Sequence, residues 1–369
     1  MKANSNLSVL RLLARLGSSF DIVSGGELDR LGRIGVNGNR IVFSGVGKSR
    51  EEIREALRYR GARNQRSGIF LFNVESAEEM QVLAEEAQRH VSRGGIRPGV
   101  SMRVNPDVLA GGHRHIATGA RQHKFGVDWE EARRHYLQHR ESRSILWRGI
   151  SAHIGSQILS VEPFRCALLR LASWVRELGQ CGIRLECIDI GGGLGIRYEN
   201  ESAIDPDAYA RALSKIVKPL GCRLLFEPGR AIVGPAGVLL TRVRYVKETR
   251  GKRFVIVDAG MNDLIRPALY DGKHPITKCQ SSSPPATRLR PADVVGPVCE
   301  TGDFLARDLP LEEVRAGDLL IAWAAGAYGF VESSNYNARP RAAEILVEGS
   351  RFRVVRRRET RAEMVRGEV

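Results

Sequence analysis

The stretch LECIDIGGGLG, residues 185–195, decides the fold class. Its first half is a short apolar run typical of a buried strand, and a triple glycine follows at once. A helical segment, residues 206–217, comes next along the chain. The same order recurs on the N-terminal side, with a strand-like run at 145–153 and a helical segment at 163–178. This alternation of strand and helix predicts a parallel sheet.

The alternation extends over the first two-thirds of the chain. Strand-like runs occupy residues 21–23, 41–44, 69–74, 100–104, 145–153, 185–190 and 223–226. Further helical segments occupy residues 49–60, 77–91 and 129–139. A predicted helix at 7–16 precedes the first run. Because each helix in such an alternation follows a strand, this helix implies one further strand before it. Seven strands plus one is the number of a (β/α)8 barrel, so we expect an α/β fold with a TIM-like barrel that lacks its first strand. An open doubly wound sheet is the alternative.

The pattern changes after Pro228. Strand-like runs then follow one another without long helices, at residues 237–246, 253–257, 294–298, 319–322, 343–347 and 352–355. Consecutive short strands separated by turns are typical of an antiparallel sheet. We therefore predict two domains, a β/α barrel over residues 1–236 and a C-terminal antiparallel β domain over 237–369.

The charge balance is strongly basic, because 57 Lys and Arg residues oppose 42 Asp and Glu residues, a net charge of +15. The basic residues are scattered, mostly as arginine beside glutamate in helical segments, which favours a compositional bias over a nucleic-acid surface. No apolar run reaches the length of about 18 residues that a membrane helix needs. We expect neither nucleic acid nor a membrane as partner.

The six cysteines form no C-x-x-C pair, so neither a zinc site nor a disulfide framework is indicated, and we expect no metal. The N-terminal residues also lack the apolar core of a signal peptide. Both observations favour a reducing, cytoplasmic location.

Chemistry in a barrel gathers at the carboxyl ends of the strands. His153 follows one predicted strand with Ser156 close behind, the triple glycine 191–193 follows the next, and Glu227 follows the last. Glycine backbone N–H groups can approach a phosphate closely, and a serine hydroxyl can add a hydrogen bond. A tight turn explains the glycines alone equally well. The first strand has no glycine-rich turn, which argues against a dinucleotide fold.

Taken together, these strand ends suit a cofactor with one phosphate and one aromatic ring. Pyridoxal phosphate fits, with the phosphate on the glycines, an imidazole against the ring and a carboxylate on the ring nitrogen. That cofactor requires a lysine at a strand end. Lys2 is the only lysine before the first predicted helix.

At this point the chain resembles the diaminopimelate decarboxylases, which belong to the alanine-racemase-like class of pyridoxal-phosphate enzymes. The motifs that carry the resemblance are KANSN (2–6), FDIVSGGEL (20–28), RVNPD (103–107), HIGSQI (153–158), GGGLGI (191–196), EPGR (227–230), DAGMNDLIRPALY (258–270), CETGDFLARD (299–308) and GAYGF (326–330). They stand in the family's order from one end of the chain to the other.

The resemblance implies a role for each matching residue. The residues implied in binding pyridoxal phosphate are Lys2, His153, Ser156, Gly191, Gly192, Gly193, Glu227, Pro228, Gly229, Arg230 and Tyr328. Those implied in binding the substrate are Arg230, Arg266, Tyr270, Glu300 and Tyr328. Lys2, which forms an aldimine with the cofactor, and Cys299, the acid that reprotonates the product, are the implied catalytic residues.

The resemblance also implies the reaction, which is decarboxylation of meso-2,6-diaminopimelate to L-lysine and carbon dioxide. In the family, Cys299 and Glu300 enter the partner subunit's site, which implies a homodimer with shared active sites. Two other hypotheses stay open: a decarboxylase of a related basic amino acid or polyamine precursor, and a non-catalytic homologue that regulates an active relative.

The start of the chain departs from the family, whose members carry a segment before the reactive lysine. One strand-and-helix unit of a barrel takes roughly 30 residues. We expect a missing or misassigned upstream segment of at least that length, and we expect the chain as given to be poorly soluble and essentially inactive.

Overall fold

The computed structural model describes residues 1–61, 68–108, 124–279 and 289–369. The chain divides into two compact units. The first contains Met1–Gly195 and Ala203–Pro228, and the second contains Ile196–Ser202 and Gly229–Val369. The boundary after Pro228 lies eight residues before the predicted one, and the short insert 196–202 packs with the second unit.

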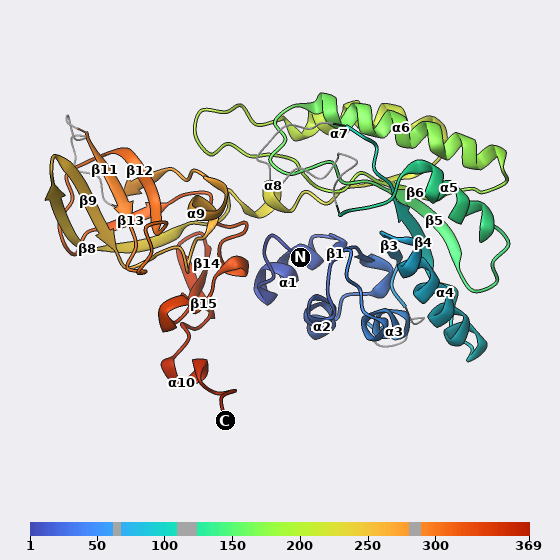
Figure 1. Ribbon diagram of the computed structural model, residues 1–369, viewed down its shortest axis with the longest axis horizontal. Coiled ribbons are helices and arrows are strands. Elements are labelled where there is room, and N and C mark those ends of the chain that lie inside the picture. Colours follow the sequence, from blue (N-terminus) through green and yellow to red (C-terminus); the bar gives the residue numbers. More distant parts are fainter. Residues whose placement is uncertain (62–67, 109–123, 280–288) are drawn as a thin grey trace. The chain divides into compact units, whose positions relative to one another are not determined.

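The first unit is built on a curled, wholly parallel sheet, which confirms the predicted barrel without its first strand (Figure 1). The strands are β1 (Phe20–Ile22), β2 (Ile41–Phe43), β3 (Leu71–Val74), β4 (Gly99–Arg103), β5 (Leu146–Ser151), β6 (Cys187–Asp189) and β7 (Arg223–Leu225), and each pairs with its neighbour in chain order. Among the described residues β1 and β7 each pair on one side only. The central strands β3 and β4 are buried along their whole length, as expected for a sheet covered on both faces.

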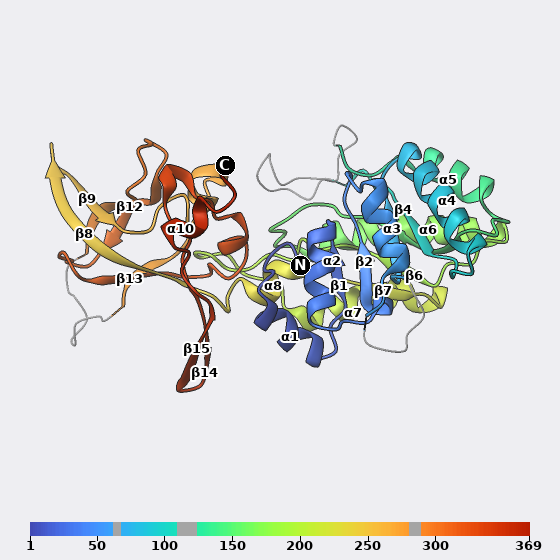
Figure 2. The ribbon, with the colours of Figure 1, turned by 90° about the horizontal axis from the view of Figure 1, so that it is seen from below.

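Helices lie on the outer side of this sheet, and all but the first, which precedes β1, join two of its strands. They are α1 (Leu7–Arg15), α2 (Gly25–Arg33), α3 (Arg50–Arg58), α4 (Ala77–Ser92), α5 (Trp129–Gln138), α6 (Val161–Gln180) and α7 (Pro206–Val217). Figures 1 and 2 show α2, α3 and α4 following one another along strands β1 to β3. Each helix starts at a serine, asparagine or aspartate whose side chain accepts a backbone N–H of the first turn. Two 3-10 turns, Gly38–Arg40 and Lys218–Leu220, complete the connections.

The second unit holds a six-stranded sheet in the order β10-β13-β8-β9-β11-β12. Its strands are β8 (Leu239–Thr249), β9 (Lys252–Val257), β10 (Ile276–Lys278), β11 (Arg290–Val295), β12 (Phe304–Leu311) and β13 (Leu319–Ala322). The sheet is antiparallel apart from the pair β9 and β11. One face buries an aliphatic core that includes Val255, Val294 and Leu320. The sequence patterns missed β10 and β12.

Smaller elements surround this sheet. The helices are α8 (Gly229–Val233), α9 (Arg266–Tyr270) and α10 (Arg361–Met364), with 3-10 turns at Phe330–Glu332 and Tyr336–Ala338. Strands β14 (Glu344–Glu348) and β15 (Arg351–Arg356) form a separate hairpin. Its apolar side chains Ile345, Val347, Phe352 and Val354 are all exposed.

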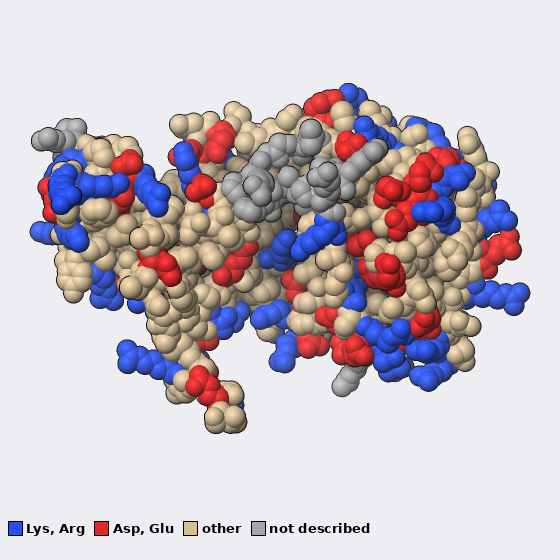
Figure 3. Space-filling model, in the orientation of Figure 1, with Lys and Arg blue, Asp and Glu red and all other residues tan. Residues whose placement is uncertain are grey.

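Basic and acidic side chains are intermixed over the face seen in Figure 3. Many arginines pair with carboxylates, as Arg165 does with Glu162 at 2.8 Å. In the part of the chain that the structure describes, no helix is long and apolar enough to span a membrane. Within the same residues, no group of three or more His, Cys, Asp or Glu side chains could hold a metal ion.

Candidate active site

The carboxyl ends of β5, β6 and β7 are tied together by backbone hydrogen bonds. The Ala152 nitrogen donates to the Asp189 carbonyl at 2.8 Å, and the Glu227 nitrogen donates to the Gly191 carbonyl at 2.9 Å. His153, the triple glycine and Glu227 therefore lie side by side, as the order of the strands predicts. Beyond His153, the Ile158 nitrogen donates to the Gly193 carbonyl at 2.9 Å, which brings the turn that contains Ser156 against the glycines.

Glycine is required at positions 191–193 both because neighbouring atoms approach the backbone closely and because the backbone has positive φ values at the first and third of these positions. Gly191 and Gly193 have φ values of 71° and 101°, which side-chain-bearing residues rarely adopt. A Cβ atom on Gly191 would lie 2.6 Å from Nδ1 of His153, and one on Gly192 would lie 2.5 Å from the Glu227 carbonyl oxygen. The space above the three strand ends is thus kept open by the absence of side chains.

His153 is half-buried and its ring orientation is set by the glycine run. Its Nδ1 accepts a hydrogen bond from the Gly192 nitrogen at 3.1 Å. Burial, and then the positive charges of Arg103 and Lys2, lower the pKa of His153 to about 3. The imidazole is therefore neutral at any physiological pH.

Lys2 is close enough to His153 for its charge to lower the pKa of that imidazole. The side chain of Lys2 is exposed, but its neighbours are fixed. The Met1 nitrogen donates to the Asp21 carbonyl in β1 at 3.1 Å, and Ala3 is only 6% exposed. Asn6 accepts the Ser8 nitrogen at 2.9 Å and so begins α1.

Glu227 lies within reach of two other carboxyl groups. A side-chain hydrogen bond joins it to Asp189 in β6, and the charge of Asp21 in β1 also acts on it. Burial, reinforced by the two neighbouring carboxylates, raises the pKa of Glu227 well above its ordinary value. Pro228, which follows it, is the last residue of the first unit, and Gly229 begins α8.

The second unit gathers the predicted arginines. Arg230, on α8, donates from Nη1 to the Tyr198 hydroxyl at 2.7 Å. The Arg266 guanidinium, at the start of α9, lies 4.4 Å from the centre of the Tyr198 ring. Both arginines are buried, at 8% and 6% exposure. Burial lowers the pKa of Arg266. Buried guanidinium groups of this kind suit a planar anion such as a carboxylate.

A histidine fixes Arg266. The Arg266 Nη1 atom lies 2.6 Å from Nε2 of His274, and Nδ1 of that histidine lies 2.8 Å from the Trp323 carbonyl oxygen. Because arginine only donates, Nε2 is the acceptor and Nδ1 carries the proton. Burial, and then the charge of Arg266, lower the pKa of His274 to about 4.

Tyr328 and Tyr270 complete this cluster. The Arg230 guanidinium lies 4.7 Å from the centre of the Tyr328 ring. Tyr328 has a φ of 57°, an uncommon conformation for a residue with a side chain, and burial raises the pKa of its hydroxyl. Tyr270 ends α9 and is half-buried, and its pKa is also raised by burial.

Cys299 and Glu300 lie on an exposed loop that is nevertheless well held. Asp303 anchors the loop, because its two carboxylate oxygens accept the Met261 and Val298 nitrogens, each at 2.6 Å. The Cys299 nitrogen donates to Oδ1 of Asn337 at 3.0 Å. Tyr336 donates its hydroxyl to Glu300. Both predicted side chains are exposed on the second unit.

The sequence patterns did not single out several residues of these clusters. Arg103 pairs with the buried Glu75 at 2.8 Å, and Asp189 contacts Glu227. Both had a signal, since Arg103 opens RVNPD and Asp189 lies two residues before the first glycine. Tyr198 and His274 had none, because they lie outside any regular pattern.

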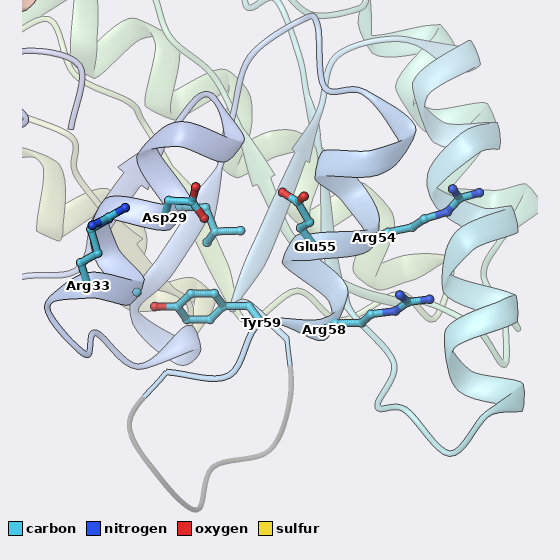
Figure 4. A pocket seen from close by; sticks show the side chains of 8 residues that line it. Asp29, Arg33, Arg54, Glu55, Arg58 and Tyr59 are labelled. Atoms are coloured by element: carbon cyan, nitrogen blue, oxygen red, sulfur yellow. The ribbon is translucent and has the colours of Figure 1, made fainter. Parts of the chain in front are cut away.

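A cavity of about 700 Å³ lies elsewhere in the first unit, between α2 and α3. Its walls carry Asp29, Arg33, Arg54, Glu55, Arg58 and Tyr59 (Figure 4). The Tyr59 hydroxyl is already used, because it donates to the Val36 carbonyl at 2.8 Å. None of the predicted site residues lines this cavity, and it lies on the helical exterior rather than at the strand ends.

The chain is similar to known decarboxylases along its whole length. The family model for the pyridoxal-binding domain of pyridoxal-dependent decarboxylases matches residues 1–234. The diaminopimelate decarboxylase of Pseudomonas fluorescens is 50% identical over 374 aligned residues, which cover all of this chain and 85% of the relative.

Solved structures give the same result. A crystal structure of diaminopimelate decarboxylase from Helicobacter pylori complexed with L-lysine matches with a TM-score of 0.91 and 42% identity, covering 99% of this chain and 88% of that one. A lysine decarboxylase from Selenomonas ruminantium is more distant, with a TM-score of 0.78 and 27% identity over 93% of this chain and 83% of that one. The identity, the coverage and the pyridoxal-binding domain together place this chain in the diaminopimelate decarboxylase family of the pyridoxal-dependent decarboxylases.

Proposed function

We propose that this chain decarboxylates meso-2,6-diaminopimelate to L-lysine and carbon dioxide, with pyridoxal 5'-phosphate as its cofactor. The observation that carries the proposal is the set of adjacent strand ends, where a neutral imidazole, an open glycine run and a half-buried carboxyl group lie side by side. The related decarboxylases of basic amino acids are the second candidate, but they are represented by the more distant match.

The residues present fit the cofactor. The glycine run leaves a cradle that a Cβ atom would fill, and its positive φ values turn the backbone as a phosphate site requires. Gly191, Gly192 and Gly193 would hold the phosphate, together with Ser156 and Tyr328. Neutral His153 would face the ring and Glu227 its nitrogen. Lys2 would bind the cofactor covalently. When bound, the cofactor supplies an acceptor for the electron pair left by the departing carboxylate.

The protein's own groups then select and orient the substrate. Arg230, Arg266 and Tyr270 would bind the carboxylate that is retained, because buried guanidinium groups hold a carboxylate in two-point contact. Glu300 would bind the distal amino group by opposite charge. Such remote contacts fix which bond breaks. The Cys299 thiol would then deliver a proton to the α-carbon.

A homodimer with shared active sites completes the proposal. Cys299 and Glu300 are exposed, as residues that enter a partner subunit's site would be before assembly. The hairpin β14–β15 exposes Phe352 at 75% and Val347 at 64%, and two-stranded hairpins need a packing partner to be stable. Association in a reducing cytoplasm is consistent with the six free cysteines.

The decisive experiment measures carbon dioxide release from meso-diaminopimelate, L-lysine and L-ornithine in parallel. We expect a preference for meso-diaminopimelate by several orders of magnitude in kcat/KM, since an unpaired buried charge costs about 2–5 kcal/mol for each lost contact. Borohydride reduction and peptide mapping should place a pyridoxyl group on Lys2. Comparable turnover of ornithine, or a label on another lysine, would contradict the proposal.

A further inference from the structure

A row of buried polar side chains crosses the interior of the first unit and ends at Glu227. Asn73 in β3 is its centre. The Asn73 Nδ2 atom donates to Oδ2 of Asp189 at 3.1 Å and to Oγ of Ser44 at 3.0 Å, while Oδ1 accepts the Ser101 hydroxyl. Ser44 in turn is hydrogen-bonded to Asp21. Asn73, Ser101 and Asp189 are 3%, 0% and 1% exposed, so water does not compensate for any lost partner.

The donors around Asp189 decide where the proton of the carboxyl pair resides. Oδ1 of Asp189 accepts the Gly191 nitrogen at 2.9 Å, and Oδ2 accepts the Asn73 amide. Both are N–H donors that cannot reverse, and hydrogen bonds to both oxygens favour the carboxylate form of Asp189 over that of Glu227. Two carboxyl groups form a hydrogen bond only if one carries a proton. The hydrogen bond between Asp189 and Glu227 therefore favours the proton on Glu227, whose pKa the Asp189 contact raises.

Little positive charge compensates the carboxyl pair of Asp189 and Glu227. Arg103 in β4 acts on both carboxyl groups, but it is already paired with Glu75. Asp21 adds a third acidic group, and burial raises its pKa to about 7 despite the nearby amino terminus and the Ser44 hydroxyl. Glu27 also acts on Asp21, in the same direction as burial. Burial is likewise the largest cause that raises the pKa values of Asp189 and Glu227.

We propose that Asp189 is a positioning residue that holds Glu227 at the strand ends and keeps one proton on the pair until the cofactor binds. The proposal rests on Glu227 facing the ring nitrogen. On binding, Glu227 would release its proton to the solvent, so that its carboxylate could accept a hydrogen bond from a protonated ring nitrogen. Asp189 and Glu227 would then share the negative charge that the cofactor requires at this point.

The first test follows the unfolding of the full-length chain without cofactor as a function of pH. A group that keeps its proton in the folded state loses stability as the pH rises above its unfolded pKa, near 4 for a carboxyl group. As the pH rises through this range, each retained proton lowers the folding equilibrium constant by up to tenfold per pH unit. We expect the pH dependence of unfolding in Asp189→Asn to correspond to one retained proton fewer than in the wild type, between about pH 5 and 7. Glu227→Gln, which removes the other carboxyl group of the pair, should also lose one retained proton.

Ser101→Ala is the matched control. It removes a buried member of the same network that does not touch Glu227, so it should lower stability without changing the number of retained protons. If all three variants shift the pH dependence equally, or if Asp189→Asn leaves it unchanged, the pair does not hold the proton.

The second test counts protons directly, by calorimetric titration of pyridoxal 5'-phosphate in buffers of different ionisation enthalpy. Asp189→Asn should release about one proton fewer than the wild type on binding the cofactor, and Ser101→Ala should match the wild type. Equal release in all three would overturn the proposal. Because neither test uses a substrate, a wrong decarboxylation assignment would leave these results unaffected.

Discussion

His274 shows how a residue without any sequence signal can set the geometry of a predicted one. It accepts a hydrogen bond from Arg266 and donates to the Trp323 carbonyl, so the guanidinium has one orientation. Lys2, His153 and Glu227 could be predicted because they follow strand-like runs and belong to motifs. His274 and Tyr198 could not, because only the tertiary fold brings them to the arginines.

We predict that His274→Phe raises KM for meso-diaminopimelate roughly 10- to 100-fold with a smaller change in kcat, since a hydrogen bond to a charged group contributes about 1.5–3 kcal/mol. His274→Gln keeps an acceptor and should recover part of the affinity. Steady-state kinetics at pH 7.5 would decide, and an unchanged KM in both variants would exclude the role. Since the pKa of His274 is lowered to about 4, its contribution to stability is complete above about pH 6.5 and is lost as the pH falls toward 4.

At the scale of elements, the order of strands in the first unit could be predicted because short apolar runs alternate with amphipathic helical segments. Two strands of the second unit could not. β12 contains Pro310, which pairs with Pro291 in β11, and proline normally argues against a strand. It is tolerated here because β12 lies at the edge of its sheet. β10 has only three residues, too few for a periodic pattern.

The contact between α3 and α4 depends on one carboxylate. Glu86 is 4% exposed and accepts hydrogen bonds from Arg50 at 2.6 Å, Arg54 at 2.7 Å and Arg89 at 2.6 Å. The Arg54 hydrogen bond is the largest cause that lowers the pKa of Glu86, to about 2. Three arginines thus converge on one acceptor.

We predict that Glu86→Gln lowers the free energy of unfolding by about 1–3 kcal/mol, because three guanidinium groups lose their shared anion. Urea denaturation at pH 7 measures it. The difference from the wild type should shrink as the pH falls from about 4 toward 2, where Glu86 itself becomes protonated. Glu162→Gln, which removes an exposed partner of Arg165, is the control and should have little effect. Equal effects of the two substitutions would refute this account of the contact.

At the scale of the whole molecule, the predicted site residues are divided between the two units. Lys2, His153 and Glu227 belong to the first, and Cys299 and Glu300 to the second. A homodimer with shared sites makes a specific prediction from this division. Lys2→Ala and Cys299→Ala chains should each be impaired, Cys299→Ala by roughly 10²–10⁴-fold if its thiol is the proton donor.

Mixed in equal amounts and allowed to exchange, the two variants should regain about a quarter of the wild-type activity. Half of the dimers are then mixed, and each mixed dimer carries one intact site of two. Mixed dimers purified by two different affinity tags give the cleanest measurement. Tagged mixed dimers without activity would show that the two residues act within one chain.

The short segment around Lys2 has a consequence for proteolysis. Trypsin cuts after lysine and needs the residues around the cleaved bond in an extended, accessible form. Ala3 is 6% exposed, the Asn4 nitrogen donates to the Met1 carbonyl at 3.0 Å, and Arg30 donates to the Ser5 carbonyl at 3.1 Å. The bond after Lys2 is therefore shielded while the fold persists, although the lysine side chain itself is exposed. Release of a peptide that begins at Ala3 would report how often this corner of the molecule opens.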